Sequence, residues 1–345
     1  MNHFDFFRKT PANVCGQCMA FSDKYYCIVC GNGKTKVYDN ETDAPIADIK
    51  GVKNIIRARF ISDNEILVKG NLGNYLIYDF AKKVFTWEYH SKPSDTFDND
   101  WVVSGDELLD KSYSYAKNTP YKGLPFFLNY RTNEVNLLKN YREPTFGKRI
   151  PNKWDLTIGT LLKSSYGGHA FLVDDYTVYD IDFNTHSADI LFSNKDFEDS
   201  NKYKYALVTC DSLCGNIVAV KYSDTDKKQN DVVVYNRKAH EEFVIDSYYN
   251  QRFDRSYACS SYQMYFDKSG RYLAIATSII NKKEGGSFLD FDSDGYIRII
   301  DTVLKKEIYC NYGTDEKFGY IDGVQWHENT LYMFTDKKIY RMTME

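Results

Sequence analysis

Short runs of alternating apolar and polar residues occur along the whole chain, and residues typical of tight turns separate them. An alternation with a period of two predicts β-strands that have one buried face. The clearest example is MAFSDKYYCIVCGNGKTKVYD at residues 19–39, which reads as three strands joined by two turns. No convincing stretch between such runs has the 3.6-residue period of a surface helix. We therefore expect an all-β fold.

A four-residue motif that ends a strand recurs along the sequence. It finishes with an aromatic residue or Ile followed by a polar or charged residue. Its copies are KVYD (36–39), LIYD (76–79), LNYR (128–131), TVYD (177–180), VVYN (233–236), RIID (298–301) and KIYR (338–341). Most copies precede a further alternating run, and several follow a strand–turn–strand unit, so we assign four strands to each repeat. Seven repeats, 40 to 65 residues apart, predict a seven-bladed β-propeller of four-stranded blades.

The seven predicted blades account for residues 1–345 as one domain. Their approximate bounds are 14–50, 54–90, 97–140, 150–194, 204–246, 256–312 and 318–345. The last blade lacks residues for a fourth strand, and residues 2–10 precede the first blade. We expect residues 2–10 to supply the missing strand, because a strand from the other end of the chain closes the ring and leaves no open sheet edge.

These units resemble the WD40-repeat family. In residues 18–39 the segments AFS, KYY and KVYD stand where the family has Ala-Phe-Ser, Lys-Tyr-Leu and Lys-Val-Trp-Asp. Residues 57–79 and 264–301 follow the same scheme. Tyr or Ile replaces the family's Trp, and the Gly-His pair between blades is missing. The resemblance implies a propeller fold for the whole chain and a divergent member of the family.

Composition narrows the class of protein. Phe, Trp and Tyr make up 16% of the 345 residues, and aromatic residues favour strands. The formal net charge of −4 argues against a protein built as a whole to bind nucleic acid or an anionic membrane. Eight cysteines without a signal-peptide pattern, and no apolar run of about 20 residues, indicate a cytoplasmic protein with reduced thiols and no membrane span.

Two Cys-x-x-Cys pairs, Cys15 with Cys18 and Cys27 with Cys30, have the composition of a zinc site. The repeat pattern instead puts Cys18, Cys27 and Cys30 in strands. Side chains three positions apart on a strand point to opposite faces, so Cys27 and Cys30 cannot both bind one metal ion. We expect buried structural thiols and no cofactor.

Residues 290–301, DFDSDGYIRIID, match the Asp-x-Asp-x-Asp-Gly pattern of a calcium loop. Asp290, Asp292 and Asp294 could converge on a cation around a bend at Gly295. The twelfth position is Asp301, which would lie about 20 Å away in an extended strand and cannot close the site. The alternatives are weak calcium binding by the first three carboxylates and an acidic hairpin loop without metal.

Unequal connection lengths indicate where a partner binds. Turns between first and second strands, and between third and fourth strands, are short. Six longer segments join the other strand ends and should lie together on the opposite face: 91–100, 139–153, 194–204, 223–231, 246–257 and 280–294. Two of them are rich in Tyr, Phe, Arg and Lys, the residue types of protein interfaces. The predicted partner-binding residues are Tyr141, Arg142, Phe146, Lys148, Arg149, Tyr248, Tyr249, Arg252, Phe253 and Arg255.

We therefore predict a non-enzymatic cytosolic scaffold that binds a protein partner on that face, for instance a bacterial adaptor or immunity protein. No nucleophile elbow, phosphate-binding loop or His-Glu-x-x-His motif is present. One alternative is a hydrolase or lyase with its site at the central channel. Another is carbohydrate or single-stranded nucleic-acid binding by the aromatic loops. We expect a monomer.

Overall fold

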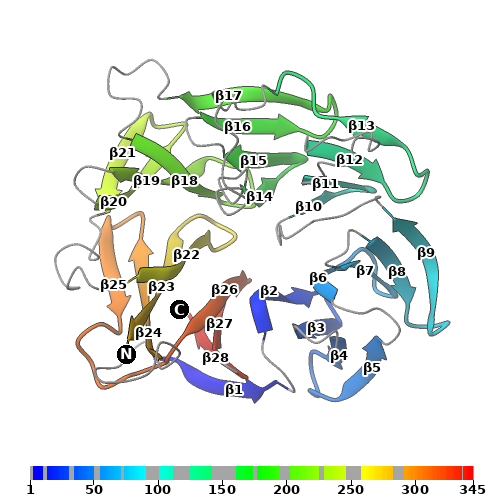
Figure 1. Ribbon diagram of the computed structural model, residues 1–345, viewed down its shortest axis with the longest axis horizontal. Helices are drawn as coiled ribbons and strands as arrows, with labels where there is room; N and C mark the ends of the chain where they lie inside the picture. Colours follow the sequence, from blue (N-terminus) through cyan, green and yellow to red (C-terminus); the bar gives the residue numbers. More distant parts are fainter. Residues whose placement is uncertain are drawn as a thin grey trace.

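The computed structural model describes residues 3–10, 14–30, 35–49, 55–70, 74–90, 101–111, 125–141, 161–173, 177–193, 203–224, 229–245, 258–282, 291–335 and 337–344. Within these ranges the chain forms strands and turns, and no helix long and apolar enough to cross a membrane is found. The described strands make seven four-stranded sheets. The sheets stand as blades around a central axis (Figure 1). The prediction of a seven-bladed β-propeller is confirmed.

Each blade runs from an innermost strand near the central axis to an outermost strand at the rim. Blade 1 comprises, in that order, β2 (Val14–Phe21), β3 (Tyr25–Cys30), β4 (Thr35–Asp39) and β5 (Pro45–Ile49). Blade 2 comprises β6 (Ile55–Phe60), β7 (Glu65–Gly70), β8 (Asn74–Asp79) and β9 (Val84–His90). Blade 3 comprises β10 (Val102–Ser104), β11 (Glu107–Lys111), β12 (Pro125–Asn129) and β13 (Val135–Leu137).

The remaining blades continue around the ring in the same order. Blade 4 comprises β14 (Leu161–Tyr166), β15 (His169–Val173), β16 (Thr177–Asp182) and β17 (Ser187–Ser193). Blade 5 comprises β18 (Tyr203–Cys210), β19 (Ile217–Asp224), β20 (Gln229–Asn236) and β21 (Glu241–Ile245). Blade 6 comprises β22 (Ala258–Phe266), β23 (Tyr272–Lys282), β24 (Phe291–Asp301) and β25 (Lys306–Cys310). Blade 7 comprises β26 (Ile321–His327), β27 (Thr330–Thr335), β28 (Lys338–Thr343) and β1 (Asp5–Lys9).

The first strand of the chain closes the ring, as the sequence predicts. β1 pairs antiparallel with β28, with Asp5 opposite Arg341 and Lys9 opposite Lys338. The inner strands of blades 7 and 1 also lie next to each other, and the amide of Gln325 joins them: its Nε2 donates to the Met19 carbonyl at 2.8 Å, and its Oε1 accepts from the Met19 N–H at 3.3 Å. The two ends of the chain therefore lie in one sheet, and hydrogen bonds of Gln325 join that sheet to blade 1.

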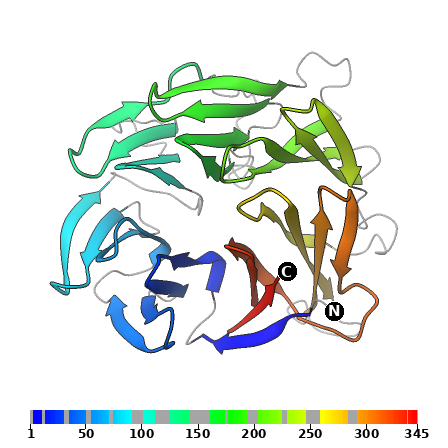
Figure 2. The same ribbon diagram turned by 180° about the vertical axis from the view of Figure 1, so that it is seen from behind.

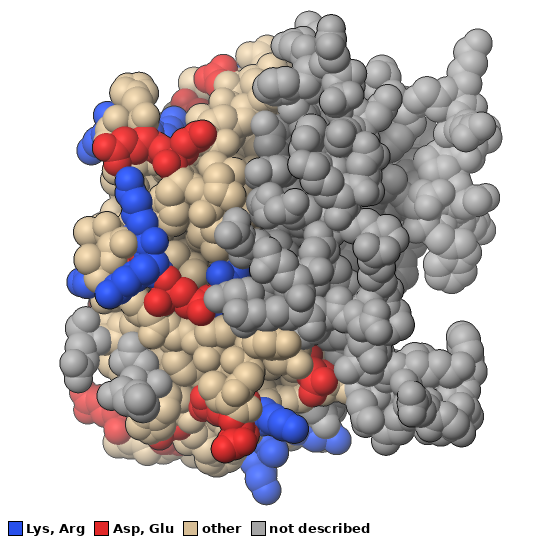
Figure 3. Space-filling view, turned by 90° about the vertical axis from the view of Figure 1, so that its left-hand side faces the viewer, with Lys and Arg blue, Asp and Glu red and all other residues tan. Residues whose placement is uncertain are grey.

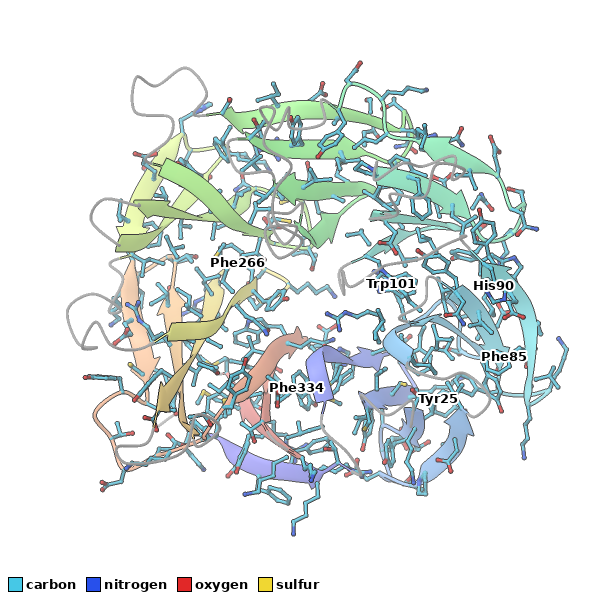
Figure 4. The ribbon with its side chains drawn as sticks, in the orientation of Figure 1. Tyr25, Phe85, His90, Trp101, Phe266 and Phe334 are labelled. Atoms are coloured by element: carbon cyan, nitrogen blue, oxygen red, sulfur yellow. The ribbon has the colours of Figure 1, made fainter. Side chains whose placement is uncertain are left out.

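The core lies between neighbouring blades, because each sheet packs against a sheet on either side. The two middle strands of a blade are consequently buried on both faces, which explains why YYCIVC, HAFLV and TLYMFT are apolar almost throughout. Leu67 and Ile77 of blade 2, for example, pack with Phe126 of blade 3. Phe334 lies in the cluster shared by blades 7, 1 and 2 (Figure 4).

One hydrogen-bonded turn joins the third and fourth strands of the first six blades. An Asp or Asn side chain at the end of the third strand accepts hydrogen bonds from groups two or three residues later, and the fourth turn residue has a positive φ although it is not Gly. The capping residues are Asp39, Asp79, Asn129, Asp182, Asn236 and Asp301. The positive-φ residues are Asp43, Lys83, Asn133, His186, His240 and Lys305, with φ between 52° and 63°.

The capping residue explains why the motif recurs. In two copies the cap is not the last residue of the motif. In LNYR the capping residue is Asn129 and not the final Arg131; in TVYD the cap is Asp182, two residues beyond the motif. A shift of two residues keeps every side chain on its predicted face, so alternation alone cannot detect it.

The strand ends define two faces of the ring. The short-turn face carries the turns between first and second strands and between third and fourth strands, and it is the face seen in Figure 2. The long-connection face carries the remaining connections. On the short-turn side each pair of neighbouring blades is linked by an ion pair among the described residues, which in one case requires protonated histidine. The seven pairs are Arg8–Asp43, Lys24–Asp63, Arg131–Glu65, His186–Glu107, Arg237–Asp180, Lys305–Glu241 and Lys268–Glu328.

Candidate partner-binding site

The predicted partner-binding residues belong to two connections of the long-connection face. One joins β13 to β14 through residues 138–160, and the other joins β21 to β22 through residues 246–257. Turns of the short-turn face are much shorter; residues 105–106 and 167–168, for example, are two-residue turns. The described strand ends that flank the two connections lie on the same side of the ring.

Of the ten predicted residues, the structure describes Tyr141. Its half-buried ring meets the ring of Tyr179 edge to face, with 5.3 Å between centroids, and packs on the core between blades 3 and 4. Tyr141 therefore anchors the beginning of its connection on the blades. The remaining nine residues lie outside the described residues, so their role stays a prediction. They are Arg142, Phe146, Lys148, Arg149, Tyr248, Tyr249, Arg252, Phe253 and Arg255.

The acidic segment of blade 6 is a strand where the sequence suggested a loop. β24 begins at Phe291, and its register puts Asp292 opposite Asn281 and Asp294 opposite Ile279. The bend expected at Gly295 is therefore wrong, since Gly295 pairs with Ser278 within the ladder. Extended pairing with β23 overrides the turn preference of Asp, Ser and Gly. Asp290 lies outside the described residues, and calcium binding stays a prediction.

Sequence reasoning missed the connection at residues 311–320, which the structure describes on the long-connection face. The Asn311 side chain fastens it to β24: its Oδ1 accepts from the Ile297 N–H at 2.7 Å and its Nδ2 donates to the Gly295 carbonyl at 3.1 Å. Gly295 also allows a close approach, because a Cβ there would overlap the Gly319 carbonyl oxygen. This connection is a fixed part of the face, and its only sequence signal is Gly295 within a strand.

Tyrosines and carboxylates surround that connection. Tyr296 and Tyr312 have ring centroids 5.3 Å apart, and the Tyr309 hydroxyl donates to Glu316 at 2.5 Å. Burial, the nearby charge of Asp294 and Tyr312 raise the pKa of Tyr296 to about 12, so this phenol is neutral at physiological pH. Neutral tyrosines on a fixed backbone suit protein recognition, because they offer apolar area and a hydroxyl at low entropic cost.

The cysteines occupy strands, as the repeat pattern predicts. Cys18 lies in β2, Cys27 and Cys30 lie in β3, and all three are buried in the cluster of blades 7, 1 and 2. Burial raises the pKa of Cys18 and of Cys27 well above the usual value for a thiol. A metal ion binds the thiolate, so this environment disfavours metal binding.

Four polar side chains meet on the short-turn face where blade 4 contacts blade 5. His169 Nδ1 lies 3.0 Å from one oxygen of Asp180, and the Tyr166 hydroxyl donates to the other at 2.7 Å. Arg237 of blade 5 donates to the Tyr166 hydroxyl at 3.2 Å and to Asp180 at 3.4 Å. Burial, together with the hydrogen bond to Asp180, raises the pKa of Tyr166 to about 12. A histidine oriented by a carboxylate can act as a general base, and the described contacts of His169 are with Asp180 and the ring of Tyr166.

This cluster departs from the repeat at Asp180. Two residues before the cap, the other turn-bearing blades have a buried apolar residue that faces the next blade, namely Val37, Ile77, Phe127, Val234 and Ile299. Blade 4 has Asp180 at this position, and Arg237 of blade 5 forms an ion pair with it. A partly buried ion pair in place of an apolar contact adds no stability by itself.

No protein-family model matches the chain, and neither does any curated protein. Solved structures do match. The β-propeller domain of Myceliophteria thermophila Cps50 (Swd1) has a TM-score of 0.61 and 12% identity, and the match covers 99% of this chain and 100% of that one. The C-terminal WD40 domain of Sif2 has a TM-score of 0.57 and 11% identity, with 95% and 81% covered. BamB from Moraxella catarrhalis has a TM-score of 0.55 and 15% identity, with 96% and 86% covered.

Proposed function

We propose that this chain, a WD40-like seven-bladed β-propeller, is a non-enzymatic scaffold that binds a protein partner on its long-connection face. The contacts come from Tyr141, Arg142, Phe146, Lys148 and Arg149 in one connection, and from Tyr248, Tyr249, Arg252, Phe253 and Arg255 in the other. Tyr and Arg supply most of the binding energy in many protein interfaces. The proposed compartment is the cytoplasm, and the partner's identity is left to experiment.

The observation that carries this proposal is the contrast between the two faces. The third-to-fourth-strand turns share one length and one capped geometry across six blades. The insertions, up to residues 138–160, belong to the other strand ends. Connections longer than the fold requires carry function more often than the scaffold does. Likeness to the WD40 domain of Sif2 and the propeller of Cps50 supports the fold that presents them.

The test is affinity capture with a triple variant, Phe146→Ala, Tyr248→Ala and Tyr249→Ala. Tyr141 is left intact because its ring packs on Tyr179, and its loss would disturb the core. We expect the variant to keep the melting temperature of the natural protein and to lose a specific partner. Phe6→Ala, a change at an exposed ring of β1, is the matched control and should keep the partner. Full capture by the triple variant would refute the proposed site.

The pairing of His169 with Asp180 is the observation from which an enzymatic role can be tested. If the chain is a hydrolase, His169→Gln should abolish turnover of a panel of ester and phosphoester substrates while partner capture is unchanged. The binding proposal expects no turnover above the buffer rate from either protein, measured with the same preparation used for capture.

A further inference from the structure

The short-turn face of blades 5 and 6 differs in charge from the rest of that face. Its four turns are residues 211–216, 237–240, 267–271 and 302–305. They contain five cationic side chains: Arg237, Lys238, Lys268, Arg271 and Lys305. Their two acids, Asp211 and Asp267, are buried and accept hydrogen bonds from their own turns. The charges within these turns that face solvent are therefore positive. Adjoining acids pair with four of them: Asp180 with Arg237, Asp301 with Arg271, Glu241 with Lys305 and Glu328 with Lys268.

The same four turns expose large apolar side chains. Leu213 is 58% exposed, Val303 is 71% exposed and Leu304 is 54% exposed. Val303 and Leu304 are the second and third residues of the capped turn, where blade 1 has Glu41 and Thr42. Blade 3 has Arg131 and Thr132 at these positions, and blade 4 has Asn184 and Thr185. The turn geometry does not require apolar residues, so the turn itself does not explain the exposed pair in blade 6.

Hydrogen bonds hold the backbone that carries these apolar side chains. The amides of Val303 and Leu304 both donate to the buried carboxylate of Asp301, at 3.0 and 2.8 Å, and the Thr302 hydroxyl donates to the Gly270 carbonyl at 2.8 Å. The turn of Leu213 approaches the same Gly270, because a Cβ there would lie 2.8 Å from the Asp211 Cβ. The turn 267–271 therefore touches both of the others through Gly270.

We propose that this basic and apolar surface is a second docking site, which binds an acidic protein segment that carries apolar anchor residues. Leu213, Val303 and Leu304 would receive the anchors, and the surrounding cations would pair with Asp and Glu. Two of these cations now pair with exposed acids, Lys305 with Glu241 and Lys268 with Glu328, each at 3.4 Å. Exposed pairs of this kind contribute little, so an incoming carboxylate can replace them. In Figure 3 basic side chains lie along the left-hand edge, on this side of the molecule, with acidic side chains between them.

An acidic peptide fits this surface better than an anionic membrane does. A flat bilayer would meet the whole face, including the turns of blades 1 and 2. Asp23 and Glu41 are exposed there, and Asp43 and Asp63 pair with Arg8 and Lys24, so those turns offer no excess of positive charge to attract an anionic surface. A peptide of about ten residues need cover only blades 5 and 6, where the cations stand.

The test selects peptides from a displayed library of random 12-residue sequences on the immobilised full chain. We expect enrichment of sequences that combine Asp or Glu with Leu, Phe or Trp. Their affinity should fall at least tenfold in V303N/L304T, which gives blade 6 the turn residues of blade 4, and in Lys238→Glu. Binding should also weaken from 50 to 300 mM salt. Each variant is first checked for an unchanged melting temperature.

Controls separate this surface from the long-connection face. The Phe146, Tyr248 and Tyr249 triple variant should bind the selected peptides as the natural protein does, and so should the charge reversal Lys83→Glu in blade 2. Enriched peptides without net negative charge, or peptides that V303N/L304T binds equally well, overturn the proposal. Binding to phosphatidylserine vesicles that V303N/L304T abolishes also overturns it, in favour of a membrane.

Discussion

Lys69 and Asp110 form an ion pair in which neither side chain is exposed: Nζ lies 2.6 Å from Oδ2. Lys69 belongs to β7 of blade 2 and Asp110 to β11 of blade 3, and the Tyr75 hydroxyl donates to the same carboxylate oxygen at 2.6 Å. Trp101, labelled in Figure 4, stacks on Tyr75 at 6.3 Å between centroids. Two charges removed from water are tolerated only when their partners are in place. The pair therefore specifies how blade 2 fits against blade 3.

Removal of one member of this pair should be costly. We expect Lys69→Met to lower the free energy of unfolding by about 3–5 kcal/mol, because it leaves the Asp110 carboxylate buried without its cation. The double variant Lys69→Met/Asp110→Leu should be more stable than Lys69→Met, since it removes both charges. Urea denaturation monitored by tryptophan fluorescence measures both. The exposed pair Lys24–Asp63 is the control, and its loss should have little effect. A double variant less stable than Lys69→Met would contradict this account.

Deletion of residues 2–10 should destabilise the whole ring. It removes β1, exposes the edge of β28 and uncovers the sites of Phe4, which meets Tyr309 and Phe318, and of Phe7, which meets Tyr332. Burial of one Phe side chain is worth about 1.5–3 kcal/mol. Calorimetry should show a lower and broader transition for the deletion. Phe6→Ala, at an exposed ring of the same strand, should leave the transition nearly unchanged.

The capped turns predict an acid-dependent loss of stability. Hydrogen bonds from the Thr42 amide and hydroxyl hold the pKa of Asp39 below its usual value, and the Lys82 side chain does the same for Asp79. A carboxylate whose pKa is lower in the folded state contributes stability above the unfolded value, about pH 4, and loses it as the pH falls through the folded value. Denaturation between pH 6 and pH 3 should show this loss.

A pair of matched variants isolates the effect. Asp39→Asn keeps the accepting oxygen but cannot ionise, so its stability should fall less steeply with acid than that of the natural protein. Asn129→Asp, at the equivalent position of blade 3, should make the fall steeper. Equal slopes for all three proteins would show that the caps do not govern acid stability.

Thiol reactivity should follow burial. Cys214 is exposed in the turn of blade 5, whereas Cys18, Cys27 and Cys30 are buried and burial raises the pKa of Cys18 and Cys27. Iodoacetamide labelling followed by peptide mass spectrometry should modify Cys214 within minutes and the three buried thiols only after denaturant is added. Native labelling of Cys27 at the rate of Cys214, or one bound zinc per chain, would reverse our interpretation of these cysteines.

The blades and their closure could be predicted because strand alternation and tight turns are local signals. The position of the cap could not be predicted in blades 3 and 4, since LNYR and TVYD are displaced by two residues and displacement by a full period leaves the pattern intact. The segment around Asp294 was misjudged for the opposite reason. Its composition is that of a turn, and pairing with β23 makes it a strand.

Contacts between blades could not be predicted from the spacing of residues along the sequence. Asp180 and Arg237 are 57 residues apart, and Lys69 and Asp110 are 41 apart, so only the ring brings them together. The exposed Val303 and Leu304 were visible in the sequence as an apolar pair within a turn. That they depart from the equivalent polar positions of blades 1, 3 and 4 was evident only once the structure aligned the capped turns.

The pairing of β1 with β28 also sets an order of events during folding. The strands of the first six blades join neighbours that follow them closely in sequence, so each of these blades can form soon after its own hairpins. β1 must instead meet residues more than 300 positions away, and ring closure therefore has the largest entropic cost of any contact. Until that strand docks, blade 7 has three strands and the edge of β28 is unpaired, which exposes it to aggregation.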